Sequence, residues 1–116
     1  MGNTQEIGRA AEKVAEDYFL KKGFRLVARN FRTKGSEIDL VLARGGLLLF
    51  VEVKGRKGDW EPHAWHPQWQ GKRRRLRAAT KEFLNRNPEC FDQADEFGFE
   101  IVFVTQGRVV ACFREA

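Results

Sequence analysis

Cysteine, proline and long apolar runs are all scarce in this sequence. Two cysteines among 116 residues, Cys90 and Cys112, are too few for a disulfide framework, so we expect reduced thiols in a cytoplasmic protein. No apolar run could span a bilayer and the N-terminus is polar, so we expect neither a membrane helix nor a secretory signal. The length and mixed composition predict a single globular domain over residues 1–116.

Negative charge is also in deficit. The chain has 21 Lys and Arg residues against 16 Asp and Glu, a formal net charge of +5. An excess of positive charge favours a polyanionic partner such as nucleic acid, although its distribution matters more than its total.

Hydrophobic spacing predicts two helices and five strands. Apolar residues from Ile7 to Phe19 recur at helical spacing, and a second helical stripe is ended by Pro88. The order α-β-β-β-α-β-β predicts an α/β fold in which helices pack on a mixed β-sheet. The helices are expected at residues 3–22 and 69–87, and the strands at residues 24–31, on either side of Gly45–Gly46, and on either side of Gln106–Gly107.

The segment EIDLVLARGGLLLFVEVKGRK, residues 37–57, sets acids and a lysine into an otherwise aliphatic hairpin. Gly45–Gly46 suits a tight two-residue turn, which would set Arg44 opposite Leu47. One face is then wholly aliphatic, which supports this register. Its opposed pairs are Ile38 with Val53, Leu40 with Val51, and Leu42 with Leu49. The other face opposes Asp39 to Glu52 and Glu37 to Lys54.

Two facing carboxylates in an apolar sheet need a physical reason, because like charges directly opposite destabilise a sheet. A bound cation, a shared proton, or neutralisation by Lys54 and nearby arginines would each supply one. Asp39, Glu52 and the backbone carbonyl of Val53 form an oxygen-rich corner that suits Mg²⁺ or Mn²⁺. The competing interpretation is an ordinary solvated charge network.

The second predicted helix begins with a cluster of cations. Cations near a helix N-terminus oppose the helix dipole, and a bound phosphate would relieve that conflict. We therefore expect this cluster to contact a nucleic-acid backbone, the alternative being a merely solvated face. Its members are Lys72, Arg73, Arg74, Arg75 and Arg77.

The loop before this helix, residues 59–69, has no usable periodicity. Trp69, like Trp60 and Trp65, would stack on bases or anchor the loop, and anchoring is the commoner role of tryptophan. His63 and His66 have no partner thiols, so a zinc site is not expected.

Taken together, these features resemble the phosphodiesterase site of the restriction-endonuclease-like superfamily. Its pattern is an acid, a spacer and then (Asp/Glu)-x-Lys on the next strand, which Asp39 and Glu52-Val53-Lys54 match; Ile38 stands where proline is frequent. More closely, the chain resembles the YraN-like bacterial family of predicted nucleases, which is related to archaeal Holliday-junction resolvases. The segments that carry this likeness are IGRAAEKVAEDYFLKKGFRLVARNFRTKGSEIDLVLA, FVEVKGRK and KRRRLRAATKEFL.

The resemblance implies a restriction-endonuclease-like fold and a metal-dependent endonuclease acting on DNA, including branched or structured DNA. It implies catalytic roles for Asp39, Glu52 and Lys54, and it adds Glu12 as a further ligand of the metal ion. Glu37 would support the site, either by pairing with Lys54 or at a second ion. Two other classes remain open: a nucleic-acid-binding module that does not cut, and a structural or interaction protein that forms a partner contact or homodimer.

Overall fold

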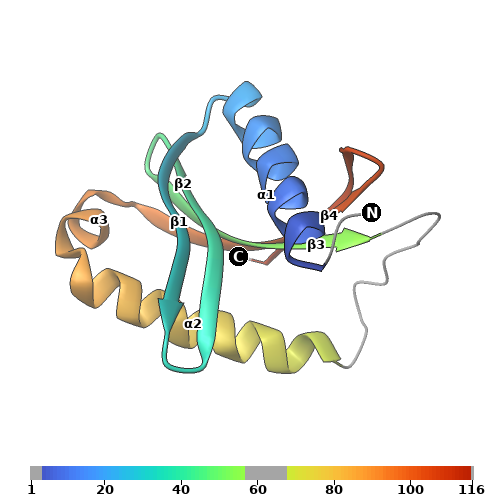
Figure 1. The fold of residues 1–116 in the computed structure, drawn as a ribbon. Helices are drawn as coiled ribbons and strands as arrows, with labels where there is room; N and C mark the ends of the chain where they lie inside the picture. Colours follow the sequence, from blue (N-terminus) through green and yellow to red (C-terminus); the bar gives the residue numbers. More distant parts are fainter. Residues whose placement is uncertain (1–3, 57–67, 116) are drawn as a thin grey trace.

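The computed structural model describes residues 4–56 and 68–115, with side chains for residues 6, 8–55 and 74–114 (Figure 1). It confirms the predicted α/β fold and its order of elements, and it adds one short helix that begins at Pro88. The elements are α1 (Thr4–Lys21), β1 (Arg25–Thr33), β2 (Ser36–Arg44), β3 (Leu47–Arg56), α2 (Gln68–Arg86), α3 (Pro88–Gln93), β4 (Glu96–Thr105) and β5 (Arg108–Glu115). In the parts of the chain described, no helix is long and apolar enough to cross a membrane.

The five strands form one mixed sheet in sequence order, β1-β2-β3-β4-β5. Neighbouring strands are antiparallel except β3 and β4, which are parallel. A parallel pair needs a long connection, and α2 and α3 lie within the segment that joins these two strands. Figure 1 shows α1 on one face of the sheet and α2 on the other.

The turn between β2 and β3 falls at Gly45–Gly46, as predicted. Gly45 has a positive φ of 57°, which glycine adopts without strain. Gly46 has a different role, because a Cβ at this position would collide with the side chain of Asp95. The backbone N–H groups of Asp95 and Glu96 donate to the Gly46 carbonyl over 2.7 and 3.1 Å. The turn therefore anchors the start of β4 beside β3.

Each helix covers its own hydrophobic cluster on the sheet. The aromatic rings of Phe31 and Phe50 both pack edge-on against Phe83 of α2. The α1-side cluster contains Ala11, Ala15, Phe19, Phe24, Leu40, Leu42, Leu49, Val51, Val102 and Val104. The α2-side cluster contains Ile38, Val41, Ala43, Leu48, Phe50, Leu76, Ala79 and Phe83.

The predicted β2–β3 register is confirmed for the part of the hairpin next to the turn, and the ladder of paired residues ends beyond it. The structure pairs Arg44 with Leu47, Leu42 with Leu49 and Leu40 with Val51, as the two-residue turn predicts. The last of these is also the last pair of the ladder. The further pairs predicted for Ile38, Asp39 and Glu37 are not formed, because the two strands separate there.

The face predicted for Ile38 is wrong. Leu40 packs in the α1-side cluster, but Ile38 packs in the α2-side cluster, although residues two apart on a strand normally share a face. The side-chain alternation of β2 is therefore broken at Asp39. This break lies at the point where β2 leaves β3.

The partner strand β1 is broken at the same level, at Asn30. Arg29 on one side of it reaches α1, whereas Phe31 on the other side packs against α2. Asn30 itself has a φ of 50°, a conformation that asparagine adopts more readily than most side chains. Both β1 and β2 therefore exchange their two faces at this level. Beyond it, the acidic end of β2 is separated from β3.

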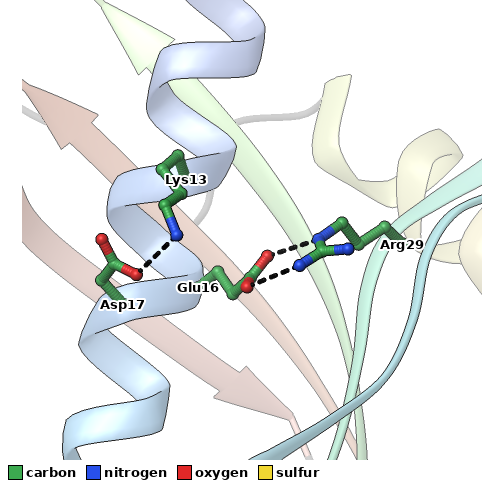
Figure 2. A network of polar contacts seen from close by, with 4 residues as sticks. All are labelled: Lys13, Glu16, Asp17 and Arg29. Atoms are coloured by element: carbon green, nitrogen blue, oxygen red, sulfur yellow. Dashed lines mark hydrogen bonds and ion pairs between the residues drawn. The ribbon is translucent and has the colours of Figure 1, made fainter.

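An ion pair whose carboxylate is buried joins α1 to β1 (Figure 2). The Arg29 guanidinium donates to both carboxylate oxygens of Glu16, over 2.7 and 2.9 Å. The Glu16 side chain is 6% exposed, and the arginine lowers the pKa of its carboxyl. Glu12 lies one turn earlier on the same side of α1, and it reaches Asn30, the next residue of β1.

Candidate functional site

A cavity of about 560 Å³ lies where β2 and β3 separate. It gathers residues from α1, from the hairpin that joins β1 and β2, from β3 and from α2. The lining residues are Glu12, Arg32, Thr33, Gly35, Ser36, Glu37, Asp39, Glu52, Val53, Lys54, Arg75 and Leu76. The structure thus brings together all six residues predicted for the catalytic and metal-binding centre, namely Glu12, Glu37, Asp39, Glu52, Val53 and Lys54.

Asp39 occupies the place where the β2–β3 ladder would have continued. Its carboxylate oxygen Oδ2 accepts a 2.7 Å hydrogen bond from the backbone N–H of Val53. The N–H and C=O of one strand residue point to the same side, so the Val53 carbonyl also points from β3 toward β2.

Three carboxylates from α1 and β2 converge in the cavity. Glu12, Glu37 and Asp39 each offer one oxygen, and the three oxygens lie within 4.8 Å of one another. We refer to these three residues as the acid cluster. Oxygens this close can share one divalent cation, since metal–oxygen bonds are about 2.0–2.6 Å long.

The acid cluster is electrostatically unfavourable without a cation. Burial, together with the carboxylates of Glu12 and Glu37, raises the pKa of Asp39 to about 7, against the opposing effect of the hydrogen bond from Val53. Burial and the charge of Glu37 also raise the pKa of Glu12. Both shifts mean that the folded protein disfavours negative charge here, which a bound cation would reverse.

Glu52 lies in the same cavity and has a cationic partner, which is one of the explanations that the sequence left open. Its carboxylate forms a 2.9 Å ion pair with Lys54, two residues along β3. Both side chains are about one-fifth exposed, at 19% and 18%. Glu12 and Glu37 are the acids grouped with Asp39 within 4.8 Å, while Glu52 pairs with Lys54. Glu37 itself pairs with Arg32 rather than with Lys54.

Of the predicted nucleic-acid surface, the structure describes the side chains of Arg74, Arg75 and Arg77. Arg75 lines the cavity, and the preceding residue Arg74 is exposed on α2. Arg77 lies elsewhere, with its guanidinium 5.9 Å from the ring centre of Phe99 on β4. The predictions for the side chains of Trp69, Lys72 and Arg73, and for Trp60, Trp65, His63 and His66, lie outside what the structure describes.

Sequence reasoning missed the tip of the β1–β2 hairpin, which forms one wall of the cavity. Arg32, Thr33 and Ser36 line it from this side. The tip is also bound to α2, because the Ser36 hydroxyl donates a 2.6 Å hydrogen bond to the backbone carbonyl of Arg75. A signal was available, since the tip sequence RTKGS joins two cations to small polar residues next to Glu37.

Comparison with known proteins places the chain in a family. The family model of "Uncharacterised protein family UPF0102" matches residues 11–104, a span that includes the whole acid cluster. The chain belongs to this family. The predicted YraN-like membership is thereby confirmed.

Individual UPF0102 proteins show the extent of the similarity. The chain is 42% identical over 81 residues to a UPF0102 protein of Hahella chejuensis, covering 70% of this chain and 65% of the relative. It is 43% identical over 83 residues to one of Rhodopseudomonas palustris, covering 71% and 62%. A third, from Anaeromyxobacter, is 34% identical over 118 residues, covering 99% and 86%. The first two matches thus span less than two thirds of each UPF0102 relative.

Proposed function

We propose that this UPF0102 protein is a metal-dependent endonuclease that hydrolyses phosphodiester bonds in DNA, with branched or structured DNA among the candidate substrates. One observation carries the proposal: the acid cluster of Glu12, Glu37 and Asp39 lies in one cavity with the Glu52–Lys54 pair. Acids that bind a metal ion, next to a lysine, are the components that metal-assisted phosphodiester hydrolysis requires.

The chemistry of the acid cluster fits Mg²⁺ or Mn²⁺. Its donors are carboxylate oxygens, which these hard cations prefer, and its members come from two separate elements of the fold. Asp39, Glu12 and Glu37 would hold the ion, with the Val53 carbonyl as a further donor on the same side. When bound, the ion would supply Lewis-acid polarisation of the scissile phosphate and a more acidic water.

The residues around the acid cluster have roles that follow from their places. Lys54 would orient the attacking water or stabilise negative charge that grows on the phosphate in the transition state. Glu52 holds the Lys54 ammonium group in the cavity through their 2.9 Å ion pair. Arg75, on the cavity wall, would contact the flanking backbone and would give affinity without sequence preference.

A cleavage assay tests the proposal. Wild type is incubated with duplex, single-stranded and branched DNA in Mg²⁺ or Mn²⁺, beside the variants Asp39→Ala and Lys54→Ala. Lys81→Ala is the matched control, because Lys81 is exposed on α2 and does not line the cavity. We expect cleavage by wild type and the control and a loss of at least about a hundredfold in the two site variants. Failure of wild type to cut any substrate, or equal cutting by the variants, rejects the enzyme.

A nucleic-acid-binding module that does not cut is the second candidate. The ion pairs of Glu52 with Lys54 and of Arg32 with Glu37 favour it, because they show that two of the acids already have cationic neighbours. This candidate predicts DNA binding that weakens with salt and is indifferent to divalent ions. An interaction protein, the third candidate, predicts neither metal binding by calorimetry nor DNA retention.

A cytoplasmic location belongs to the same proposal. Cys90 and Cys112 are free thiols in the structure, and thiols persist in a reducing compartment. Fractionation of cells that produce the full-length protein would test this location.

A further inference from the structure

The tip of the β1–β2 hairpin, residues 32–36, is a structured element and not a loose turn. The N–H of Gly35, which has a φ of 110°, donates to the Thr33 carbonyl over 2.8 Å, and the Thr33 hydroxyl lies 3.3 Å from the Ser36 carbonyl. The bond from Ser36 to the backbone of Arg75 then fixes the tip against α2. Cations from two distant parts of the chain, Arg32 and Arg75, thereby line one cavity.

Arg32 lines the same cavity as the acid cluster and pairs with one of its members, Glu37. Its Nε is 3.1 Å from a Glu37 carboxylate oxygen, and its positive charge also acts on Glu12, whose pKa it lowers against the larger effect of burial. The Arg32 side chain is 76% exposed. An ion pair as exposed as this one contributes little to stability, so exchange of partners is energetically easy.

From these contacts we propose that the hairpin tip is a phosphate-binding element, and that Arg32 passes from Glu37 to a DNA backbone phosphate when a divalent cation occupies the acid cluster. A cation bound to the acid cluster would draw negative charge from the Glu37 carboxylate and repel the guanidinium, so in this proposal binding of the cation weakens the ion pair of Glu37 with Arg32. The released guanidinium would then be available in the same cavity that Lys54 lines. This inference rests on the proposed function, and it adds a part of the substrate surface that α2 does not supply.

The chemistry of the tip suits a phosphodiester backbone. The planar guanidinium of arginine can donate two parallel hydrogen bonds to a phosphate, and these bonds gain strength from its charge. Lys34, exposed at the apex of the tip, and Arg75, on α2, extend the positive charge to either side. Contacts of this kind fix the position of a duplex without reading its sequence.

Two binding measurements on the Arg32→Gln variant test the inference, because they are expected to change in opposite directions. Calorimetry with Mn²⁺ alone should show tighter binding, since Arg32 no longer competes for Glu37 or repels the cation. Anisotropy of a fluorescein-labelled DNA duplex should show weaker binding in Ca²⁺, by about fivefold, the loss of one charged hydrogen bond. In EDTA, where Arg32 stays on Glu37, the loss should be less than about twofold.

Two further variants are the controls. Arg32→Lys keeps the charge and should recover part of the DNA affinity. Arg108→Gln removes the same charge from an exposed arginine on β5 that does not line the cavity, and it should change neither measurement. The DNA is checked for cleavage after each titration.

The inference is overturned if Arg32→Gln weakens Mn²⁺ binding or leaves it unchanged, or if it weakens DNA binding equally in Ca²⁺ and EDTA. Its failure is distinguishable from failure of the proposed nuclease. A wild type that binds Mn²⁺ and DNA but cuts nothing rejects the nuclease and leaves the exchange of Arg32 intact. A wild type that cuts DNA, with Arg32→Gln unchanged in both binding measurements, rejects only the exchange.

Discussion

The backbone N–H of Val53 donates a 2.7 Å hydrogen bond to Asp39, and this bond lies one step beyond the last β2–β3 pair. The side chain of Asp39 thus accepts a hydrogen bond that the backbone of β2 would accept in a continuous ladder. The bond holds the Asp39 carboxylate between the separating strands, where Glu12 and Glu37 can approach it. The candidate site therefore exists because the sheet is interrupted here.

The raised pKa of Asp39 predicts how pH affects the stability of the metal-free protein. An acid whose pKa rises from 3.8 to about 7 on folding binds a proton more tightly when folded than when unfolded. The free energy of unfolding should then fall as pH rises from about 4 to about 7, and the loss should remain at higher pH.

Asp39→Asn removes this charge and keeps an oxygen that can accept the bond from Val53. The variant should be more stable than wild type by about 2–4 kcal/mol at pH 8, with little difference at pH 4. Urea unfolding in EDTA at the two pH values measures this. If Asp39→Asn changed the free energy of unfolding equally at both pH values, the negative charge of Asp39 would not be what destabilises the metal-free protein.

The positive φ of Asn30 predicts that two variants at this position, Asn30→Ala and Asn30→Gly, differ in stability in the order opposite to that of an ordinary strand. This φ of 50° is strained for alanine and free for glycine, so Asn30→Ala should be about 1 kcal/mol less stable than Asn30→Gly. In an ordinary strand the order would be reversed, because glycine weakens strands. Thermal unfolding of the two variants decides between these orders. Both variants also lose the hydrogen bond to Glu12 and should bind Mn²⁺ more weakly than wild type.

The pair of Arg29 and Glu16 predicts an asymmetry between its two members. Arg29→Ala leaves the nearly buried Glu16 carboxylate unpaired, so it should destabilise the protein more at pH 8 than Glu16→Gln does. Glu16→Gln leaves only an arginine that is more than half exposed, and it should cost about 1 kcal/mol. The pKa of Glu16 is lowered in the folded state, so the stability that Arg29 contributes should disappear as pH falls through that pKa. Equal costs, or a cost of Arg29→Ala that does not depend on pH, would contradict this.

The sequence predicted the parts of the fold that follow from local patterns. Gly45–Gly46 fixed the hairpin turn and its register, and Pro88 marked the end of α2, although a short helix follows it at once. The register of that hairpin places Asp39, Glu52 and Lys54 at its open end, and the three residues do line one cavity there.

What could not be predicted depends on contacts between elements. The face of Ile38 was wrong because alternation was assumed to continue through Asp39, and only the packing of β1 between two helices shows that it does not. Asparagine at position 30, a residue disfavoured in strands, was the one local sign of this. The approach of Glu12 to Glu37 depends on how α1 lies on the sheet, which Glu16 and its distant partner in β1 determine.

The central claim is that the three acids bind one divalent ion, and anomalous diffraction from crystals soaked in Mn²⁺ tests it most directly. The account predicts one strong anomalous peak about 2.0–2.6 Å from carboxylate oxygens of Glu12, Glu37 and Asp39, and no such peak in Asp39→Asn crystals soaked in the same way. Wild-type crystals with no peak between these oxygens, at Mn²⁺ concentrations that fill ordinary carboxylate sites, would contradict it.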